Sequence, residues 1–434
     1  MAFYVNVGYR FALPLTVRAT GSVILGSAMP MHQLQRRQFG PSHHHLATRV
    51  FDPQLYLATL DPAACRRHCA VLASYPWFGA EGLPEYDSGR QTQAGWRRVA
   101  EQGVAAAWPR APLSDPDAIQ QAAAECIDFQ TQLGCSSIIL PSPLTVDPTT
   151  DYTTELMWLD AGLRYAREEN PSDLPLLATV ALSDICVRFA DPMANPLLDL
   201  VLDTVSARGV DGAYIVLEQA AEPADTKHCG SSLPLASVLH LVHRFTHDAG
   251  VRVGVNFLGF FGLACEAAGA EFWACGWYKS LYRLRLADRM AEGRAVPAYW
   301  SYPAALDVNL DAEFDQLGRI GLIDDIADMT PASAGLLEAA RDGISSNNVP
   351  AWRYARSNVA AAQEHFLISA SNADGKFIAV DPPHRISSAT TWLSTAAAHA
   401  ANVAAALGPM GRTKTAHVQA WLDAFQSFRR SHNV

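Results

Sequence analysis

The strongest constraint on the fold is an alternation of short apolar segments with longer amphipathic segments between residues 136 and 275. We interpret the apolar segments as buried strands and the stretches between them as helices. The strand candidates are 136–140, 176–182, 212–217, 251–257 and 271–275. Buried strands that alternate with helices are typical of βαβ units, in which the strands are parallel. This region therefore predicts an α/β fold.

Two further strand candidates flank this region, at 46–57, which ends near Asp52, and at 296–300. Asp115 followed by Pro116 predicts the start of a helix, because Asp is a frequent N-cap and Pro suits the first turn. With seven strand candidates, the pattern favours a (β/α)8 TIM-type barrel over an open sheet.

The chain divides into three predicted parts. Residues 46–310 form the barrel, and residues 1–45 form an N-terminal extension that could be partly disordered, although 4–25 alternates enough to form strands. Residues 311–434 form a helical C-terminal extension that packs on the barrel and could mediate assembly into an oligomer. Its Ala-rich helical segments are 332–341, 352–370, 387–407 and 421–428, with a turn expected at 372–375.

The net charge of −10 and the pI of 5.8 argue against a protein that is strongly basic overall and binds nucleic acid through its whole surface. No apolar run approaches the roughly 18 residues of a membrane span, and no basic segment precedes an apolar one at the start, so we expect neither a membrane span nor a signal peptide. These features predict a cytoplasmic protein.

The eight cysteines are scattered through apolar segments, which predicts reduced, buried thiols rather than a disulfide framework. Cys65 and Cys69 are four residues apart and His228-Cys229 is isolated, so the spacing does not indicate a zinc site. The sequence also lacks a P-loop, a Gly-rich dinucleotide fingerprint and a Gly-x-Ser-x-Gly elbow. We therefore expect no metal and no cofactor.

In a barrel of this kind the active site lies at the carboxyl ends of the strands. Several candidate side chains also have a structural interpretation: Asp52 could cap a turn before Pro53, Asn256 could be a hydrogen-bonded core amide, and Asp184 could lie at the rim. The polar residues at the predicted strand ends are Asp52, Asp87, Ser88, Gly89, Ser142, Asp184, Glu218, Asn256 and Lys279.

Three motifs occur in a characteristic order: Tyr86-Asp87-Ser88-Gly89-Arg90, then the run from Gly269 to Cys275, then a basic segment from Lys279 to Arg285. Over about residues 85–290, this order resembles the catalytic barrel of the tRNA-guanine transglycosylases. That family carries an Asp-Ser-Gly-Gly turn early in the barrel and a Gly-x-Asp-Met-Phe-Asp-Cys run late in it. The resemblance implies that Asp87 acts on a nucleobase as general acid or base, within a pocket shaped by Ser88 and Gly89.

The chain departs from the family pattern at decisive positions. Ala274 stands where the family has the Asp nucleophile, and a methyl group cannot form a glycosyl-enzyme intermediate. The family's base-reading Asp would fall near Pro141 or Ser142, where there is no carboxylate. If catalysis persists, Asp87, Glu218 or Asp52 would have to replace the missing carboxylates.

A local basic stretch and an aromatic cluster follow the last of these motifs. The functional interpretation is contact with the phosphates of tRNA or DNA and stacking on a base or sugar, with Ser142, Asn256, Trp277, Lys279 and Arg283 as binding residues. The structural interpretation is a solvated helix face and core aromatics. The members are Lys279, Arg283, Arg285, Arg289 and Arg294, and Trp273, Trp277, Tyr278, Tyr299, Trp300 and Tyr302.

Three functions are compatible with these features. The first is a divergent transglycosylase-like barrel that binds or exchanges a nucleobase in nucleic acid or in a nucleoside. The second is a barrel hydrolase or lyase for a small polar metabolite, which would use Asp52, Glu218 and Asn256. The third is a catalytically inactive binding or assembly subunit, which Ala274 and the helical extension favour.

Overall fold

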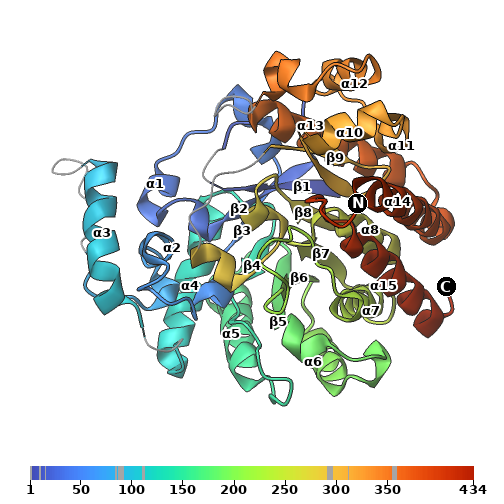
Figure 1. Cartoon of the computed structure of the whole chain (residues 1–434). Helices are drawn as coiled ribbons and strands as arrows, with labels where there is room; N and C mark the ends of the chain where they lie inside the picture. Colours follow the sequence, from blue (N-terminus) through green and yellow to red (C-terminus); the bar gives the residue numbers. More distant parts are fainter. Residues whose placement is uncertain are drawn as a thin grey trace.

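The computed structural model describes residues 2–8, 11–14, 16–83, 86, 92–109, 113–290, 297–310, 312–353 and 359–434, with only the backbone at residues 41, 279 and 290. Its centre is an eight-stranded parallel sheet in the order β3-β2-β1-β8-β7-β6-β5-β4. The strands are β1 (Ala2–Val7), β2 (Gly21–Leu25), β3 (Arg49–Asp52), β4 (Ile138–Leu140), β5 (Leu176–Ser183), β6 (Gly212–Glu218), β7 (Arg252–Asn256) and β8 (Phe272–Cys275). Figure 1 shows the strands surrounded by helices.

The sheet curls so that its two end strands, β3 and β4, come together. There the backbone N–H of Ser136 donates to the carbonyl oxygen of Arg49 at 2.8 Å, and the Ser136 hydroxyl donates to the same oxygen at 3.0 Å. The guanidinium of Arg49 also donates to the carbonyl of Leu133 at 2.8 Å. The fold is therefore a nearly closed α/β barrel of the TIM type, which confirms the predicted fold class.

The first 45 residues differ from the expected extension, because they supply two barrel strands. β1 pairs with β8 through Val5 and Cys275 and with β2 through Val5 and Ser22. All residues of β2 are buried, as are Phe3, Val5 and Val7 of β1. The alternation at 4–25 thus marks strands, and residues before 46 belong to the barrel.

Helices cover the outside of the barrel. Five connect successive strands from β3 to β8: α4 (Pro116–Gln132), α5 (Thr153–Arg164), α6 (Pro196–Ser206), α7 (Ser232–His247) and α8 (Gly262–Ala268). α4 begins as predicted, with the Asp115 carboxylate accepting the N–H of Ala118 at 2.9 Å. α2 (Arg66–Leu72) and α3 (Gln93–Ala107) lie between β3 and α4. We had not predicted α3.

The C-terminal part is helical, as expected, and it completes the barrel wall. α13 (Val359–Ile378) packs against β1, α14 (Arg385–Leu407) against α8, and α15 (Ala416–His432) against α7. The indole N–H of Trp273 in β8 donates to Asp374 of α13 at 3.1 Å. Smaller helices α10 (Ala312–Arg319), α11 (Ile323–Ile326) and α12 (Ala334–Arg341) precede them.

One local expectation was confirmed only in part, and another was wrong. The strand predicted at 296–300 is β9 (Ala298–Ser301), which pairs antiparallel with β10 (Leu306–Asn309) outside the barrel sheet. The turn predicted at 372–375 lies inside α13, because the apolar residues on both sides continue the buried face of that helix. No helix in the described part of the chain is long and apolar enough to span a membrane.

Inside the barrel, Gly254 of β7 has no side chain and so leaves room for an aromatic cluster. The ring of Phe272 stacks on Tyr4 at 4.7 Å and lies 6.4 Å from the ring of Tyr214. A Cβ added to Gly254 would lie 2.1 Å from the Phe272 ring. Close-packed interiors do not absorb such an overlap without shifting side chains or backbone.

We predict that Gly254→Ala lowers the free energy of unfolding by about 1–3 kcal/mol, because the added methyl group displaces Phe272. Urea denaturation followed by circular dichroism measures the change. The matched control is Gly375→Ala in α13, where an added Cβ meets nothing within 4 Å. That variant should be neutral or more stable by about 0.5–1 kcal/mol, since alanine favours helix. Equal stability of the two variants would contradict the packing argument.

Candidate functional site at the mouth of the barrel

A chain of hydrogen bonds crosses the barrel interior. Asn6 of β1 donates to Asn256 of β7 at 2.7 Å, Asn256 donates to the hydroxyl of Tyr214 on β6, and Tyr214 donates to Asp52 of β3 at 2.9 Å. Tyr56 donates to the same carboxylate oxygen at 2.6 Å. Strands β3 and β6 are not neighbours in the sheet, so these side chains meet only by pointing into the barrel. Asp52 and Asn256, predicted separately, thus belong to one network.

The backbone adopts a left-handed conformation close to two members of this network, Asp52 and Asn256. Gln54 has φ 55° and Phe257 has φ 61°. At these positions the N–H of Gln54 donates to Asp52 at 3.0 Å, and the N–H of Phe257 donates to Asn256 at 2.7 Å. Such a conformation costs about 1–3 kcal/mol for a residue other than glycine and persists where surrounding contacts hold it. The network is therefore rigidly built.

Asp52 is fully buried, and burial raises the pKa of its carboxyl to about 6, even though Tyr56, Tyr214, the N–H of Gln54 and the charge of Arg289 oppose that rise. Desolvation disfavours the ionised form, whereas donors and cations favour it. Asp52 therefore changes protonation just below neutral pH. It is not among the residues that line the cavities described below.

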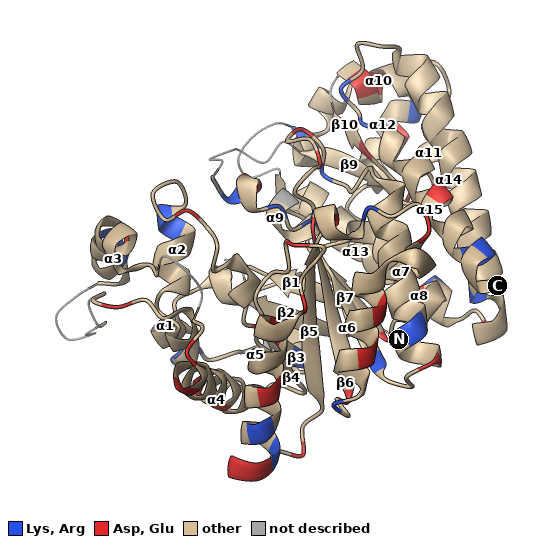
Figure 2. Cartoon of the chain, turned by 90° about the horizontal axis from the view of Figure 1, so that it is seen from below, with Lys and Arg blue, Asp and Glu red and all other residues tan. Residues whose placement is uncertain are grey.

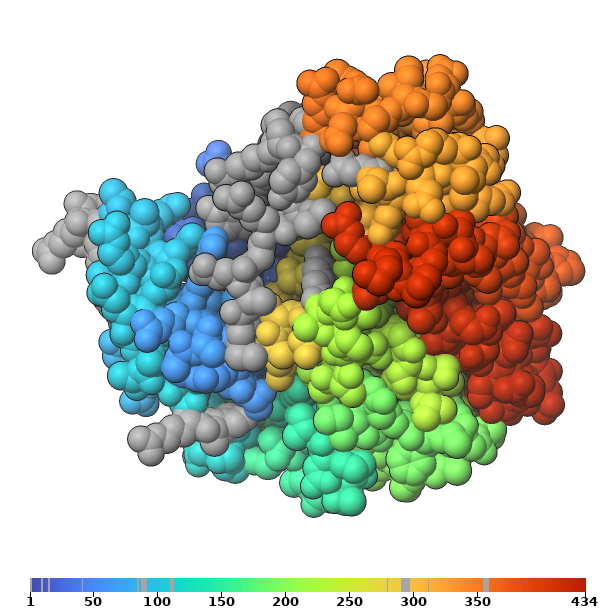
Figure 3. Space-filling model, in the orientation of Figure 1, coloured from blue at the N-terminus to red at the C-terminus, as the bar shows by residue number. Residues whose placement is uncertain are grey.

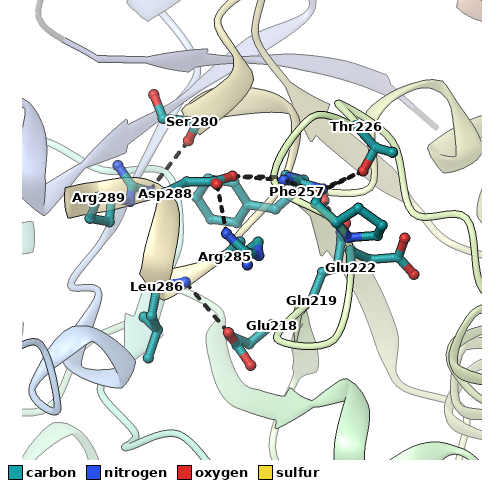
Figure 4. Close-up of polar contacts among 12 residues, drawn as sticks. Glu218, Gln219, Glu222, Thr226, Phe257, Ser280, Arg285, Leu286, Asp288 and Arg289 are labelled. Atoms are coloured by element: carbon teal, nitrogen blue, oxygen red, sulfur yellow. Dashed lines mark hydrogen bonds and ion pairs between the residues drawn. The ribbon is translucent and has the colours of Figure 1, made fainter. Parts of the chain in front are cut away.

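A segment after β8 covers part of the strand ends. Residues 283–290, called the cover segment here, join β6 and β7 through the bridges Glu218–Leu284 and Leu258–Arg283. The side chain of Arg283 is only 1% exposed and donates to Asp288 and Thr226, and to the carbonyl of Pro223. Asp288 also accepts from Arg285 at 3.0 Å (Figure 4). Arg283 thus holds the cover segment, and its burial is incompatible with the predicted contact to nucleic-acid phosphates.

Two further carboxylates at the strand ends, those of Glu218 and Asp184, are buried and hydrogen-bonded. Glu218 accepts from the hydroxyl of Ser183 at 2.8 Å and from the N–H of Leu286 at 3.4 Å (Figure 4), and burial raises the pKa of its carboxyl. Asp184 accepts from Arg188 at 2.9 Å and from the N–H of Ala221. Glu218 therefore lies under the cover segment, apart from the Asp52 network.

A cavity of about 210 Å³, called the mouth cavity here, lies at the ends of β1 and β2. α2, α3 and residues 278–289 complete its wall, and in Figure 3 the yellow part of the cover segment is seen beside the blue segment that contains α2. Its lining residues are Gly8, Leu25, Ser27, Ala28, Arg67, His68, Val71, Arg97, Tyr278, Ser280, Leu281 and Arg289. This set includes three guanidinium groups, and no carboxylate occurs among the described residues that line it.

The cations of the mouth cavity differ in burial. Arg67 is exposed, Arg97 is half-buried, and Arg289 is only 6% exposed and donates to the carbonyl of Ser280 at 3.3 Å. Burial, and then the charges of Arg289 and Arg67, lower the pKa of His68 to about 4. At neutral pH a neutral imidazole therefore lines the cavity beside the three guanidinium groups.

Other sequence candidates fall into three groups. Asp87, Ser88, Gly89 and Arg294 lie outside the described residues, as does the side chain of Lys279. Ser142 is buried at the end of β4, and its hydroxyl donates weakly to the carbonyl of Pro143 at 3.4 Å. Trp277 is half-buried and lines a second, smaller cavity with Tyr278 and Trp300.

The most important cavity residues were missed in the sequence. Arg67 and His68 lie in the run Arg66-Arg67-His68, and Arg97 lies in a helix that we had not predicted. A signal was available, because this basic run lies in the segment that follows the end of β3, and segments after strand ends form the mouth of a barrel. Asn6, in an otherwise apolar strand, was a similar signal for the interior network.

No group of three or more His, Cys, Asp or Glu side chains in the described residues is arranged to hold a metal ion. All eight cysteines are buried and free, as the thiol interpretation predicted. Comparison with known protein families gives no match, and comparison with curated proteins gives none either. The resemblance to the transglycosylases therefore rests on the quoted motifs alone and stays a prediction.

We predict that Asp52 makes stability depend on pH. Its pKa is raised from 3.8 to about 6 in the folded state, so its contribution is fully present below pH 3.8 and is lost as pH rises through 6. The loss is up to about 3 kcal/mol. In Asp52→Asn, the free energy of unfolding should fall much less between pH 4 and pH 7 than in the wild type, as measured by urea denaturation.

The control for this prediction is Asp423→Asn, at an exposed position of α15. It should retain the wild-type pH dependence. If Asp52→Asn and the control gave the same dependence, the carboxyl of Asp52 would not titrate in this range.

Proposed function

We propose that this barrel binds a small phosphorylated or carboxylated metabolite in the mouth cavity. The observation that carries the proposal is the grouping of three guanidinium groups, those of Arg67, Arg97 and Arg289, around one cavity. Guanidinium groups bind phosphates and carboxylates through charge-assisted, often bidentate hydrogen bonds. The position at the carboxyl ends of the strands, where barrels bind their ligands, supports the same proposal.

The size and setting of the cavity favour a small molecule over a nucleic acid. A volume of about 210 Å³ suits a compact ligand, and Arg289, which lines the cavity, is only 6% exposed. In the view of Figure 2, basic and acidic residues are both scattered over the ribbon. Base exchange is not included in the proposal, because Ala274 is a buried strand residue without a reactive group.

His68 is the residue that we propose for proton exchange with the ligand. It lines the mouth cavity, and its imidazole is neutral because Arg289, Arg67 and burial disfavour its protonation. A bound anion would offset these positive charges and raise the pKa of His68 towards neutrality. That change would make His68 a suitable general acid or base.

The proposal is tested by isothermal titration calorimetry with inorganic phosphate at low salt. We expect binding that weakens roughly ten-fold for each guanidinium removed, in Arg67→Gln and in Arg97→Gln, because each charged hydrogen bond contributes about 1.5 kcal/mol or more. Arg341→Gln, in α12 and paired with Asp324, is the matched control and should bind phosphate like the wild type.

Phosphate binding that is absent in the wild type, or unchanged in both cavity variants, would contradict the proposal. A gel shift with mixed tRNA and DNA is run in parallel. Tight nucleic-acid binding that depends on Arg67 and Arg97 would instead support the nucleic-acid hypothesis.

A further inference from the structure

A third cavity, of about 300 Å³, lies where the barrel closes between β3 and β4. We call it the seam cavity. Its volume reaches the range of small-molecule binding sites, about 300–1,000 Å³. None of the described residues that line it also lines the mouth cavity. The lining residues are Leu34, Gln35, Arg37, Phe39, Arg49, Phe129, Gln132 and Leu133.

The seam cavity lies at the opposite end of β3 from the interior network. Arg49 is the first residue of β3, and Asp52 is the last. The end of α4, at Gln132 and Leu133, forms another part of the wall. In barrels of this type, the amino ends of the strands contribute to stability, whereas catalysis takes place at the carboxyl ends. A ligand in the seam cavity would therefore bind apart from the mouth cavity.

Both cations of the seam cavity rest on aromatic rings. The guanidinium carbon of Arg37 lies 4.3 Å from the centre of the Phe11 ring, and that of Arg49 lies 5.7 Å from the centre of the Phe39 ring. In the described part of the chain, neither guanidinium forms an ion pair. One reason is that the chain contains no Asp or Glu before Asp52.

These two guanidinium groups keep N–H groups that a ligand can reach. The terminal nitrogens of Arg37 form no hydrogen bond with the described residues and, unlike its Nε, they are not buried. Arg49 donates from Nε to the carbonyl of Leu133 at 2.8 Å and from Nη1 to that of Leu46 at 2.7 Å, which leaves its Nη2. Burial lowers the pKa of Arg37, and a bound anion would offset that effect.

The rest of the lining is apolar or carries an amide. Leu34 and Phe129 are each only 1% exposed, and Phe39 is half-buried. Gln35 and Gln132 are exposed at the edge of the cavity. Cations beside apolar walls suit an organic acid better than inorganic phosphate, because an apolar body gains free energy when it leaves water.

We propose that the seam cavity is a second ligand-binding site, for a small carboxylic acid with an apolar body. Arg37 and Arg49 bind the carboxylate, and the apolar body packs on Phe39 and Phe129. Arg49 also donates to the carbonyl of Leu133 across the seam, so the bound acid holds the barrel closed and acts as an effector, not as a substrate. The proposed function does not depend on this site.

The test uses benzoate, with acetate as the comparison that lacks a ring, in titration calorimetry. We expect the wild type to bind benzoate about ten-fold more tightly than acetate, because the ring buries apolar area. Arg37→Gln should weaken benzoate binding roughly ten-fold, because a hydrogen bond to a charged group is lost. Arg36→Gln is the matched control. It removes the same charge from the adjacent, exposed residue, which does not line the cavity, and should bind benzoate like the wild type.

Arg67→Gln, in the mouth cavity, separates the two sites and should also bind benzoate like the wild type. If Arg67→Gln weakened benzoate binding and Arg37→Gln did not, benzoate would bind in the mouth cavity, and the present inference would fail while the proposed function gained support. Absent binding, or equal binding of benzoate and acetate, would overturn the inference as well.

Hydrogen exchange of the wild type gives a readout that needs no variant. Benzoate should slow amide exchange in residues 133–140, which lead from α4 into β4, and leave residues 278–289 at the mouth cavity unchanged. Slowed exchange confined to residues 278–289 would contradict the proposal.

Discussion

The carboxyl group of Asp52 is buried inside the barrel, and the arrangement of the strand ends depends on how it is stabilised. Two tyrosine hydroxyls and a backbone N–H donate to it, and the charge of Arg289 acts on it as well. Because Tyr214 also accepts from Asn256, the same interactions set the relative positions of β3, β6, β7 and β1. If one donor were removed, fewer hydrogen bonds would offset the desolvation of the buried carboxylate. The stability of the network therefore depends on all of its members together.

Arg289 connects this interior network with the mouth cavity. It belongs to the cover segment, which Arg283 and Arg285 fasten through Asp288. A guanidinium held at 6% exposure is costly without nearby negative charge, and Asp288 and Asp52 supply it from two sides. The basic stretch that suggested nucleic-acid contact in the sequence is therefore divided in the structure: Arg283 and Arg285 build the cover segment, whereas Arg289 faces the cavity.

Much of the barrel was predictable because its strands are short, apolar and separated by helices. Strands β3 to β8 and the start of α4 at Asp115 follow from local patterns alone. α3 was missed although Trp96, Ala100 and Val104 repeat every four residues on its buried face, because a loop rich in Pro and Gly precedes it. Local pattern also cannot show that β1 pairs with β8, since that pairing spans about 270 residues.

The candidate site was predictable only in part, for a related reason. Asp52 and Asn256 could be selected because polar residues at the ends of apolar strands are unusual. The cavity cations come from α2, α3 and the cover segment, and only the closed barrel brings them together. The second, smaller cavity similarly combines Trp277 with Phe366 of α13. Sites assembled from distant segments leave no spacing pattern in the sequence.

The packing of α13 on β1 has a consequence for how the chain folds. The described residues between β1 and β2 contain no helix, and α13 packs against β1 instead. About 350 residues separate the two elements, and closing so long a loop is entropically slow. During synthesis, α13 therefore becomes available to pack on β1 only after most of the chain has been made. Because removing the helices would expose the apolar back of β1, we expect the barrel and its C-terminal helices to fold together.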